Sequence, residues 1–376
     1  MNQYAGISLF DDLLAEPLNR LAEQAMGEGR VPVGYTCSYV PETLLSAGKL
    51  FPVRLRAPGI AGTEMADTYM SNVICSYTKS LLEFAIGGAY DRLGGVVFTA
   101  NCDHMRRLMD NLEYLRKPAF SHTLDVPHKR GGPALDWFTE ELKMLADKMS
   151  AHFGVSAAGD DLAAAIRSRN AFAEALRAIG DLRKLDPPLI TGGEFHRVMI
   201  ASLVSPKDLL MPLVEDFRRR AVERGGVGPY RARIMVAGGE LDDLSFIDVI
   251  ESQGGLVVAD RFCTGSLPGL EPVPESGDPL RAIAQHTLYK VLCPRMMEEF
   301  DEREEAIRQT ALEYRADGVI IQAIKFCDTW GVEGSTLTAA LRSAGIPVLR
   351  LEREYRHGGE GQLRTRVQAF IESMGK

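Results

Sequence analysis

Closely spaced cysteines are missing from this sequence, although it contains six cysteines in 376 residues. Structural zinc sites use close pairs such as C-x2-C, so their absence argues against that class of site. No stretch approaches 18 uncharged apolar residues, and we therefore expect no membrane-spanning helix. The opening segment MNQYAGISLFDDLLAEPLNRL lacks a basic region followed by an apolar core, so no signal peptide is expected. These absences predict a cytoplasmic protein, in which disulfides are rare.

A net positive charge is also lacking, because the formal net charge is −8. A surface that binds phosphate backbones needs a clustered basic excess, so nucleic acid is not expected as a partner. The densest basic run, Arg218–Arg220, is best explained as the polar face of a helix. With 45% hydrophobic and 25% charged residues the composition is that of a globular protein. Its length predicts two domains, or two lobes and an insert.

The pattern of apolar segments predicts an α/β protein with two lobes that resemble one another. Strands alternate with helices of ten or more residues, as in parallel sheets built from βαβ crossovers, and runs such as VVF and VII are typical of strands buried on both faces. The expected N-terminal strands are Val31–Ser38, Pro52–Ala57, Gly95–Ala100 and Ala119–Asp125, and the expected C-terminal strands are Ala232–Ala237, Gly255–Asp260, Gly318–Phe326 and Pro347–Glu354.

Helical patterns fill the segments between these strands. We expect a short helix that Pro41 opens and that ends near Gly48, and longer helices at Ser76–Gly87, 103–115, 242–254, Glu298–Tyr314, Ser335–Ser343 and Gln362–Met374. The region between the lobes is helical throughout. The predicted organisation is an N-terminal α/β lobe at residues 1–133, a helical insert at 134–228 and a C-terminal α/β lobe at 229–376.

The cysteines gather at one kind of position. Cys37 ends the first strand, Cys102 follows the third, and Cys75 opens the helix between them. In the second lobe Cys263 and Cys327 follow strands, and we expect Cys293 to open the helix that precedes the third strand. In doubly wound sheets, ligands bind beyond the carboxyl ends of the strands, so these positions face a common crevice.

Two explanations of the six thiols compete. Free cysteine is among the most buried residue types, and buried core thiols would fall in mid-strand or on the apolar stripes of helices. None of the six does. Thiolates that are gathered from several loops favour an iron–sulfur cluster over zinc. Helix N-termini also stabilise thiolates through their exposed N–H groups.

At these cysteines the sequence resembles the 2-hydroxyacyl-CoA dehydratase and benzoyl-CoA reductase family. The resemblance runs from about residue 30 to the end, and the middle helices match weakly. The stretches that carry it are CSYVPETLLSAGKLFPVRL, CSYTKSLLEFAIGGAYDRLGGVVFTANCDHMRRL, DRFCTG, LCPR, DGVIIQAIKFCD and GIPVLRLEREYRHGGEGQLRTRVQAF. Members of the family carry a cysteine-bound iron–sulfur cluster between flavodoxin-like lobes.

The resemblance implies that Cys75, Cys102 and Cys327 hold a 4Fe-4S cluster, with one iron left open to water or substrate. It also implies a partner, an ATP-hydrolysing iron–sulfur activator that delivers one electron at low potential. Dehydratase members use the electron to expel a hydroxyl group from a CoA thioester, and reductase members reduce an aromatic ring. Both kinds pair unlike, related subunits into a heterodimer.

A second branch, the double-cubane proteins, also resembles this chain closely. These proteins bind two bridged cubanes through six cysteines, reduce small molecules and form homodimers. In that reading Cys37, Cys263 and Cys293 join the other three cysteines as ligands, and Cys37 is the residue that separates the branches. A non-enzymatic metal or thiol protein remains a further alternative.

Few other residues suggest chemistry. Glu42 lies in the first turn after Pro41, His104 follows Cys102 by two residues, and Glu333 follows Cys327 by six. Each is a candidate for proton transfer, although a structural role at a helix end or surface explains each of them as well.

Overall fold

The computed structural model of the chain describes residues 8–267, 269–355 and 358–376. Pro268 and the Arg356–His357 part of the last matching stretch lie outside these residues, as does the start of the opening segment. The described helices are α1 (Ser8–Asp11), α2 (Arg20–Gly27), α3 (Ser76–Ile86), α4 (Asp103–Arg116), α5 (Gly132–Phe153), α6 (Gly159–Gly180), α7 (Gly192–Val204), α8 (Lys207–Arg224), α9 (Leu244–Ser252), α10 (Pro279–Lys290), α11 (Phe300–Glu313), α12 (Asp328–Ser343) and α13 (Glu360–Ser373), with 3₁₀ turns η1 (Leu44–Ser46), η2 (Ala66–Thr68) and η3 (Asp181–Arg183).

Two four-stranded parallel sheets confirm the predicted fold class. The strands are β1 (Val31–Tyr35), β2 (Leu50–Arg54), β3 (Gly95–Thr99), β4 (Ser121–Leu124), β5 (Ala232–Gly238), β6 (Gly255–Arg261), β7 (Gly318–Ile324) and β8 (Val348–Arg353). Their orders are β2-β1-β3-β4 and β6-β5-β7-β8, so both sheets have the same doubly wound topology. In each sheet the direction of winding reverses between the first and third strands, where such folds bind ligands.

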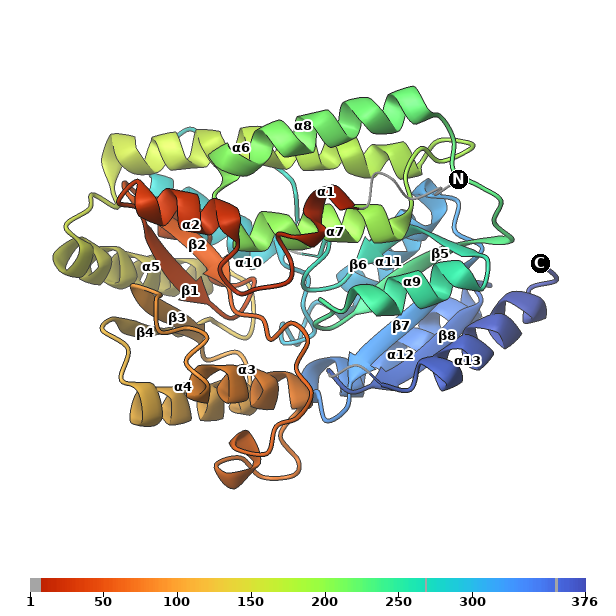
Figure 1. Cartoon of the computed structure of the whole chain (residues 1–376), viewed down its shortest axis with the longest axis horizontal. Coiled ribbons are helices and arrows are strands. Elements are labelled where there is room, and N and C mark those ends of the chain that lie inside the picture. Colours follow the sequence, from red (N-terminus) through yellow and green to blue (C-terminus); the bar gives the residue numbers. More distant parts are fainter. Residues whose placement is uncertain (1–7, 268, 356–357) are drawn as a thin grey trace.

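Helices cover both faces of each sheet, and the lobes lie side by side with α6 and α8 along one edge (Figure 1). In the N-terminal lobe α3 and α4 pack on one face, while α5 and α10 pack on the other. In the C-terminal lobe α11 and α12 cover one face, and α9 and α13 cover the other. Because α10 comes from the second half of the sequence yet packs against α5, the two lobes share helices as well as an interface.

Three helix predictions differ from the structure. The segment after Pro41 forms only the 3₁₀ turn η1, because β2 already begins at Leu50 and leaves too few residues for a longer helix. Helix α12 begins at Asp328 and not at Ser335, since burial of Trp330 against the sheet outweighs the cost of its two glycines. No helix begins at Cys293. The segment between α10 and α11 forms turns, because Arg295 binds backbone carbonyls of the other lobe.

Gly238, at the end of β5, is required by its surroundings. Its φ is +142°, and a β-carbon there would lie 1.9 Å from the Gln322 carbonyl oxygen on β7. We expect Gly238→Ala to lower the free energy of unfolding by about 3 kcal/mol, through backbone strain and forced separation of the two strands. Chemical denaturation measures this change. As a control, Gly361→Ala on α13 meets open space and should be neutral or slightly stabilising. Equal stabilities of the two variants would contradict the prediction.

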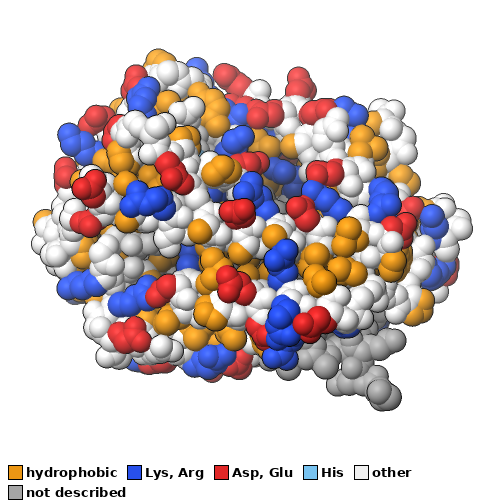
Figure 2. Space-filling view, turned by 90° about the horizontal axis from the view of Figure 1, so that it is seen from above, with side chains coloured by type: hydrophobic (Ala, Val, Ile, Leu, Met, Phe, Trp, Pro, Cys, Tyr) orange, Lys and Arg blue, Asp and Glu red, His pale blue; other side chains and the backbone are white. Residues whose placement is uncertain are grey.

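In the described part of the chain, no helix combines the length and apolar character needed to cross a bilayer. The face seen in Figure 2 carries interspersed basic and acidic side chains and not one basic patch.

Candidate functional site

Five of the six cysteines stand where the sequence predicts. Cys75, Cys102 and Cys327 are the N-cap residues of α3, α4 and α12, with extended backbones and no side-chain cap bonds. Cys37 follows β1 by two residues, and Cys263 follows β6 by two residues. Cys293 is the exception described above and lies in the loop after α10. None of the six forms a disulfide.

The thiols of both lobes are close enough to influence one another. Burial, with contributions from Cys75, Cys327 and Cys37, raises the pKa of Cys102 to about 12. Burial likewise raises the pKa of Cys293 to about 12, with contributions from Cys37 and Cys327. Cys37 and Cys327 therefore link the cysteines of the two lobes into one group.

Without a bound metal the thiols of Cys75, Cys102, Cys263 and Cys293 are neutral at physiological pH. Burial also raises the pKa of Cys75 to about 11 and holds the pKa of Cys263 well above its usual value. A bound cation would reverse this, since a coordinating thiol loses its proton. Three helix N-termini at Cys75, Cys102 and Cys327 add partial positive charge at the same place.

A single ion and a cluster place different demands on these donors. Within the described residues, no three His, Cys, Asp or Glu side chains converge as ligands of one metal ion. One tetrahedral ion needs its sulfurs about 2.3 Å from a common centre, whereas a cluster spreads its ligands over several iron atoms. An iron–sulfur group would instead draw its ligands from several of the six thiols of the two lobes.

His104 lies beside this cysteine group, as its place in the sequence suggests. It is buried, its Nδ1 accepts a hydrogen bond from the Cys75 backbone N–H at 3.2 Å, and its Nε2 is 3.7 Å from an Asp328 carboxylate oxygen. It thus joins the starts of α3, α4 and α12. Glu333 lies further along α12 and forms an ion pair with the buried Arg303, in which Arg303 Nε is 2.8 Å from Glu333 Oε1. Proton transfer by either residue stays a prediction.

Glu42 lines a pocket that adjoins the cysteine-bearing loops. Its Oε1 accepts a hydrogen bond from the Tyr35 hydroxyl at 2.6 Å, and its Oε2 pairs with the Lys207 ammonium. Burial opposes its ionisation, but Lys207 and Tyr35 outweigh burial and lower the pKa of Glu42. Glu42 is therefore ionised in the pocket, and its role in proton transfer stays a prediction.

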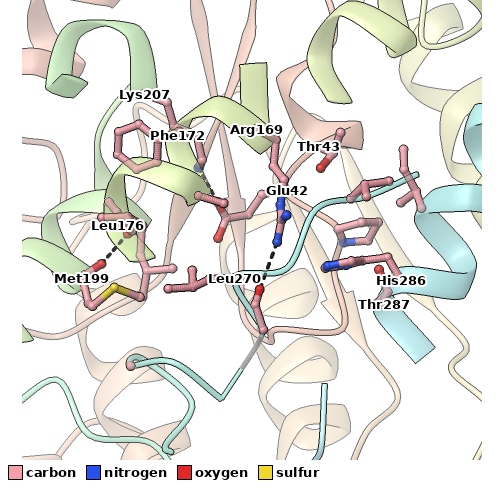
Figure 3. A pocket seen from close by; sticks show the side chains of 18 residues that line it. Glu42, Thr43, Arg169, Phe172, Leu176, Met199, Lys207, Leu270, His286 and Thr287 are labelled. Carbon is pink, nitrogen blue, oxygen red and sulfur yellow. Dashed lines mark hydrogen bonds and ion pairs between the residues drawn. The ribbon is translucent and has the colours of Figure 1, made fainter. Parts of the chain in front are cut away.

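The pocket has a volume of about 110 Å³ and is mostly apolar. Figure 3 shows Glu42 and Arg169 near its centre, with Phe172, Leu176 and Met199 on one side and His286 and Thr287 on the other. Gly265, two residues after Cys263, also lines it. Its size and its charged centre suit a small organic group with a polar end.

Sequence reasoning missed two residues that build this region. Lys207 comes from α8, 165 residues after Glu42, and no local pattern connects the two. Arg295 donates to the carbonyls of Val126 at 2.8 Å and Pro127 at 2.5 Å, which fastens the Cys293 loop to the N-terminal lobe. In the sequence, only the position of Arg295 directly after Cys293–Pro294 indicated that it could hold this loop.

His196 on α7 supports the chain segment after β5, and it makes stability depend on pH. Its Nε2 lies 2.8 Å from the Leu241 carbonyl oxygen, and burial lowers its pKa to about 4. The folded pKa is below the unfolded value of about 6.5. The unfolded chain therefore binds more protons between these values, and stability falls as pH falls through them.

We expect the free energy of unfolding to be about 2 kcal/mol lower at pH 5 than at pH 7 through His196 alone. Urea denaturation at both pH values measures it. The variant His196→Gln keeps a donor for Leu241 but cannot titrate, so its loss of stability should be smaller by that amount. An equal loss in both proteins would contradict the assignment.

Comparison with known proteins identifies relatives along the whole chain. The family model described as "2-hydroxyglutaryl-CoA dehydratase, D-component" matches residues 37–374. The (R)-phenyllactyl-CoA dehydratase beta subunit of Clostridium sporogenes is 24% identical over 97% of both chains. One of the benzoyl-CoA reductase subunits of Thauera aromatica is 23% identical over 92% of this chain and 91% of its own. The (R)-2-hydroxyglutaryl-CoA dehydratase subunit beta of Acidaminococcus fermentans is 24% identical over 98% of both.

These matches confirm the resemblance that the cysteine motifs carry. The matched range begins at Cys37 and includes all six cysteines. The chain belongs to the 2-hydroxyglutaryl-CoA dehydratase D-component family.

Proposed function

We propose that this chain is the iron–sulfur catalytic component of an enzyme that reduces or dehydrates its substrate with low-potential electrons. The observation that carries the proposal is that six thiols from both lobes, beyond the carboxyl ends of the strands, lie near enough to affect one another's pKa values. Cys75, Cys102 and Cys327 would be the core ligands. A bound cluster with an open iron would supply Lewis acidity and one-electron transfer at this place.

The chain's own residues would orient the substrate. The apolar pocket beside Gly265 would take the substrate's small organic group, and the Glu42–Lys207 pair would hold its polar end. The relatives above are named for CoA thioesters, and we propose the same class of substrate for this chain. A related second subunit would complete the enzyme, since each of these relatives is itself named as one subunit. An ATP-hydrolysing activator would supply the electrons, as the resemblance of the cysteine motifs implies.

A second candidate function is that of a double-cubane reductase of small molecules, in which all six cysteines are ligands and the chain forms a homodimer. The position of Cys37 favours it, because this thiol influences Cys102 of one lobe and both Cys263 and Cys293 of the other. The side-chain amide of Asn101 also points to the Cys37 sulfur at 3.5 Å.

Anaerobic purification followed by iron and sulfide analysis tests both candidates. About four iron atoms per chain support a single cubane, and about eight support a double cubane. An electron paramagnetic resonance signal in the reduced protein should accompany the iron. A colourless, iron-free protein from an oxygen-free preparation would reject both. A cluster that the activator cannot reduce would instead indicate a non-enzymatic metal or thiol protein.

A further inference from the structure

Two buried ion pairs join the lobes beside the cysteines. Arg54 Nη2 lies 2.7 Å from Glu240 Oε2, and Arg56 Nε lies 2.8 Å from Asp242 Oδ2. The four side chains are at most 8% exposed. Side chains two residues apart lie on the same face of an extended chain, so segments 54–56 and 240–242 face each other and are joined by these two ion pairs, which we call rungs. We call these four residues the charge ladder.

The first rung is connected to Cys37 and Cys263. Arg54 uses its second amino group, Nη1, to donate to the Ser38 hydroxyl at 2.9 Å. That hydroxyl donates in turn to the backbone carbonyl of Cys263 at 3.2 Å. Ser38 directly follows Cys37 in the N-terminal lobe. The Arg54 guanidinium therefore binds both the Glu240 carboxylate of the C-terminal lobe and the Ser38 hydroxyl next to Cys37.

The second rung is connected to Cys75 instead. The Tyr355 hydroxyl donates to Asp242 Oδ2 at 2.8 Å, and the Tyr355 backbone N–H donates to the Ser76 hydroxyl at 2.8 Å. Ser76 is the first residue of α3, next to Cys75. The two rungs therefore have the same chemistry and burial but support different cysteines.

We propose that Arg54 is a positioning residue that sets Cys37 relative to Cys263 across the lobe boundary, acting through Ser38. The proposal rests on the second candidate function above, the double cubane, in which both thiolates bind one iron–sulfur group. Only a planar fork can serve Ser38 and Glu240 at once, because a lysine ammonium is a single point charge on a flexible stem. A ligand pair from two lobes needs such a connection, since neither lobe alone fixes their separation.

The first test uses metal-free protein and needs no cluster. In a background where Cys75, Cys102, Cys293 and Cys327 are serine, dibromobimane links the Cys37 and Cys263 thiols and becomes fluorescent. We expect Ser38→Ala and Arg54→Lys each to slow linking about tenfold, the effect of losing one buried hydrogen bond. Arg56→Lys is the matched control and should leave the rate unchanged. Equal rates in all four proteins, or no linking in the parent, would overturn the proposal.

The second test measures iron in chains with all six cysteines, reconstituted without oxygen. Ser38→Ala and Arg54→Lys should each bind about half as much iron as the parent, whereas Arg56→Lys should bind as much as the parent. Full iron content in Ser38→Ala, which keeps both ion pairs and so should fold, would refute the positioning role. A parent that takes up no iron would refute the proposed function, and the thiol-linking rates would then decide the role of Arg54 by themselves.

Discussion

The variant Cys102→Ser is expected to lose about four iron atoms per chain while keeping its fold. Cys102 is the N-cap of α4, has an extended backbone and makes no side-chain cap bond. Serine is among the best N-cap residues and would add a cap bond that cysteine does not make. The substitution therefore removes the proposed ligand without weakening the helix, so a loss of iron cannot be attributed to unfolding.

Anaerobic iron and sulfide analysis and circular dichroism measure the two halves of this prediction. Activity with the proposed reducing activator should fall to the background rate, because the proposed cluster would lose one of its three core ligands. Full iron content in a folded Cys102→Ser protein would contradict the assignment of this residue.

Cys37→Ser provides the comparison that separates the two branches. Cys37 lies in a loop and caps no helix, so its substitution should also leave the fold unchanged. In a single-cubane protein the variant keeps its iron, whereas in a double-cubane protein it loses about half. Cys102→Ser should lose iron in either case, which makes the pair of variants decisive.

The positions of the strands could be predicted from the sequence because their residues satisfy local rules. Gly318–Ile324 and Gly95–Thr99 are buried along their whole length, and continuous apolar runs are what two covered faces require. The cysteines at strand ends followed from the same pattern, since the sheet order brings the carboxyl ends of β1 and β3 together.

What the sequence could not show depends on contacts between distant segments. Arg54 and Glu240 are 186 residues apart, and only the packing of the lobes brings them within 2.7 Å. Cys293–Pro294 has the pattern of a helix start, yet contacts of Arg295 with the other lobe hold the segment in turns. Glu42, a candidate for proton transfer, shows the same limit, because its partner Lys207 lies on α8, 165 residues later in the sequence.

The largest effect on stability is expected for Asp260→Ala. Asp260, at the end of β6, is 3% exposed, and its Oδ1 lies 2.8 Å from Arg183 Nη1, which is equally buried. The Arg183 guanidinium also lies over the Phe195 ring at 3.7 Å from its centroid. Removing the carboxylate leaves a buried cation without its counter-charge, which costs about 3–5 kcal/mol in the free energy of unfolding.

The same carboxylate also holds the loop that carries Cys263. Asp260 Oδ2 accepts hydrogen bonds from the Ser266 backbone N–H at 2.6 Å and from its hydroxyl at 2.8 Å. Asp260→Ala should therefore release this loop as well as destabilise the lobe. Urea denaturation measures the stability, and protease cleavage within residues 262–267 reports the release of the loop.

A double variant separates these two effects of Asp260. Adding Arg183→Met to Asp260→Ala removes the unpaired cation, and a flexible apolar side chain can fill the space over Phe195. We expect the double variant to be more stable than Asp260→Ala by about 2 kcal/mol, because the penalty arises mainly from the lone buried charge. Its loop should stay sensitive to protease, since both hydrogen bonds to Ser266 are still missing. If the second substitution destabilises the protein further, burial of the Arg183 charge is not the source of the cost.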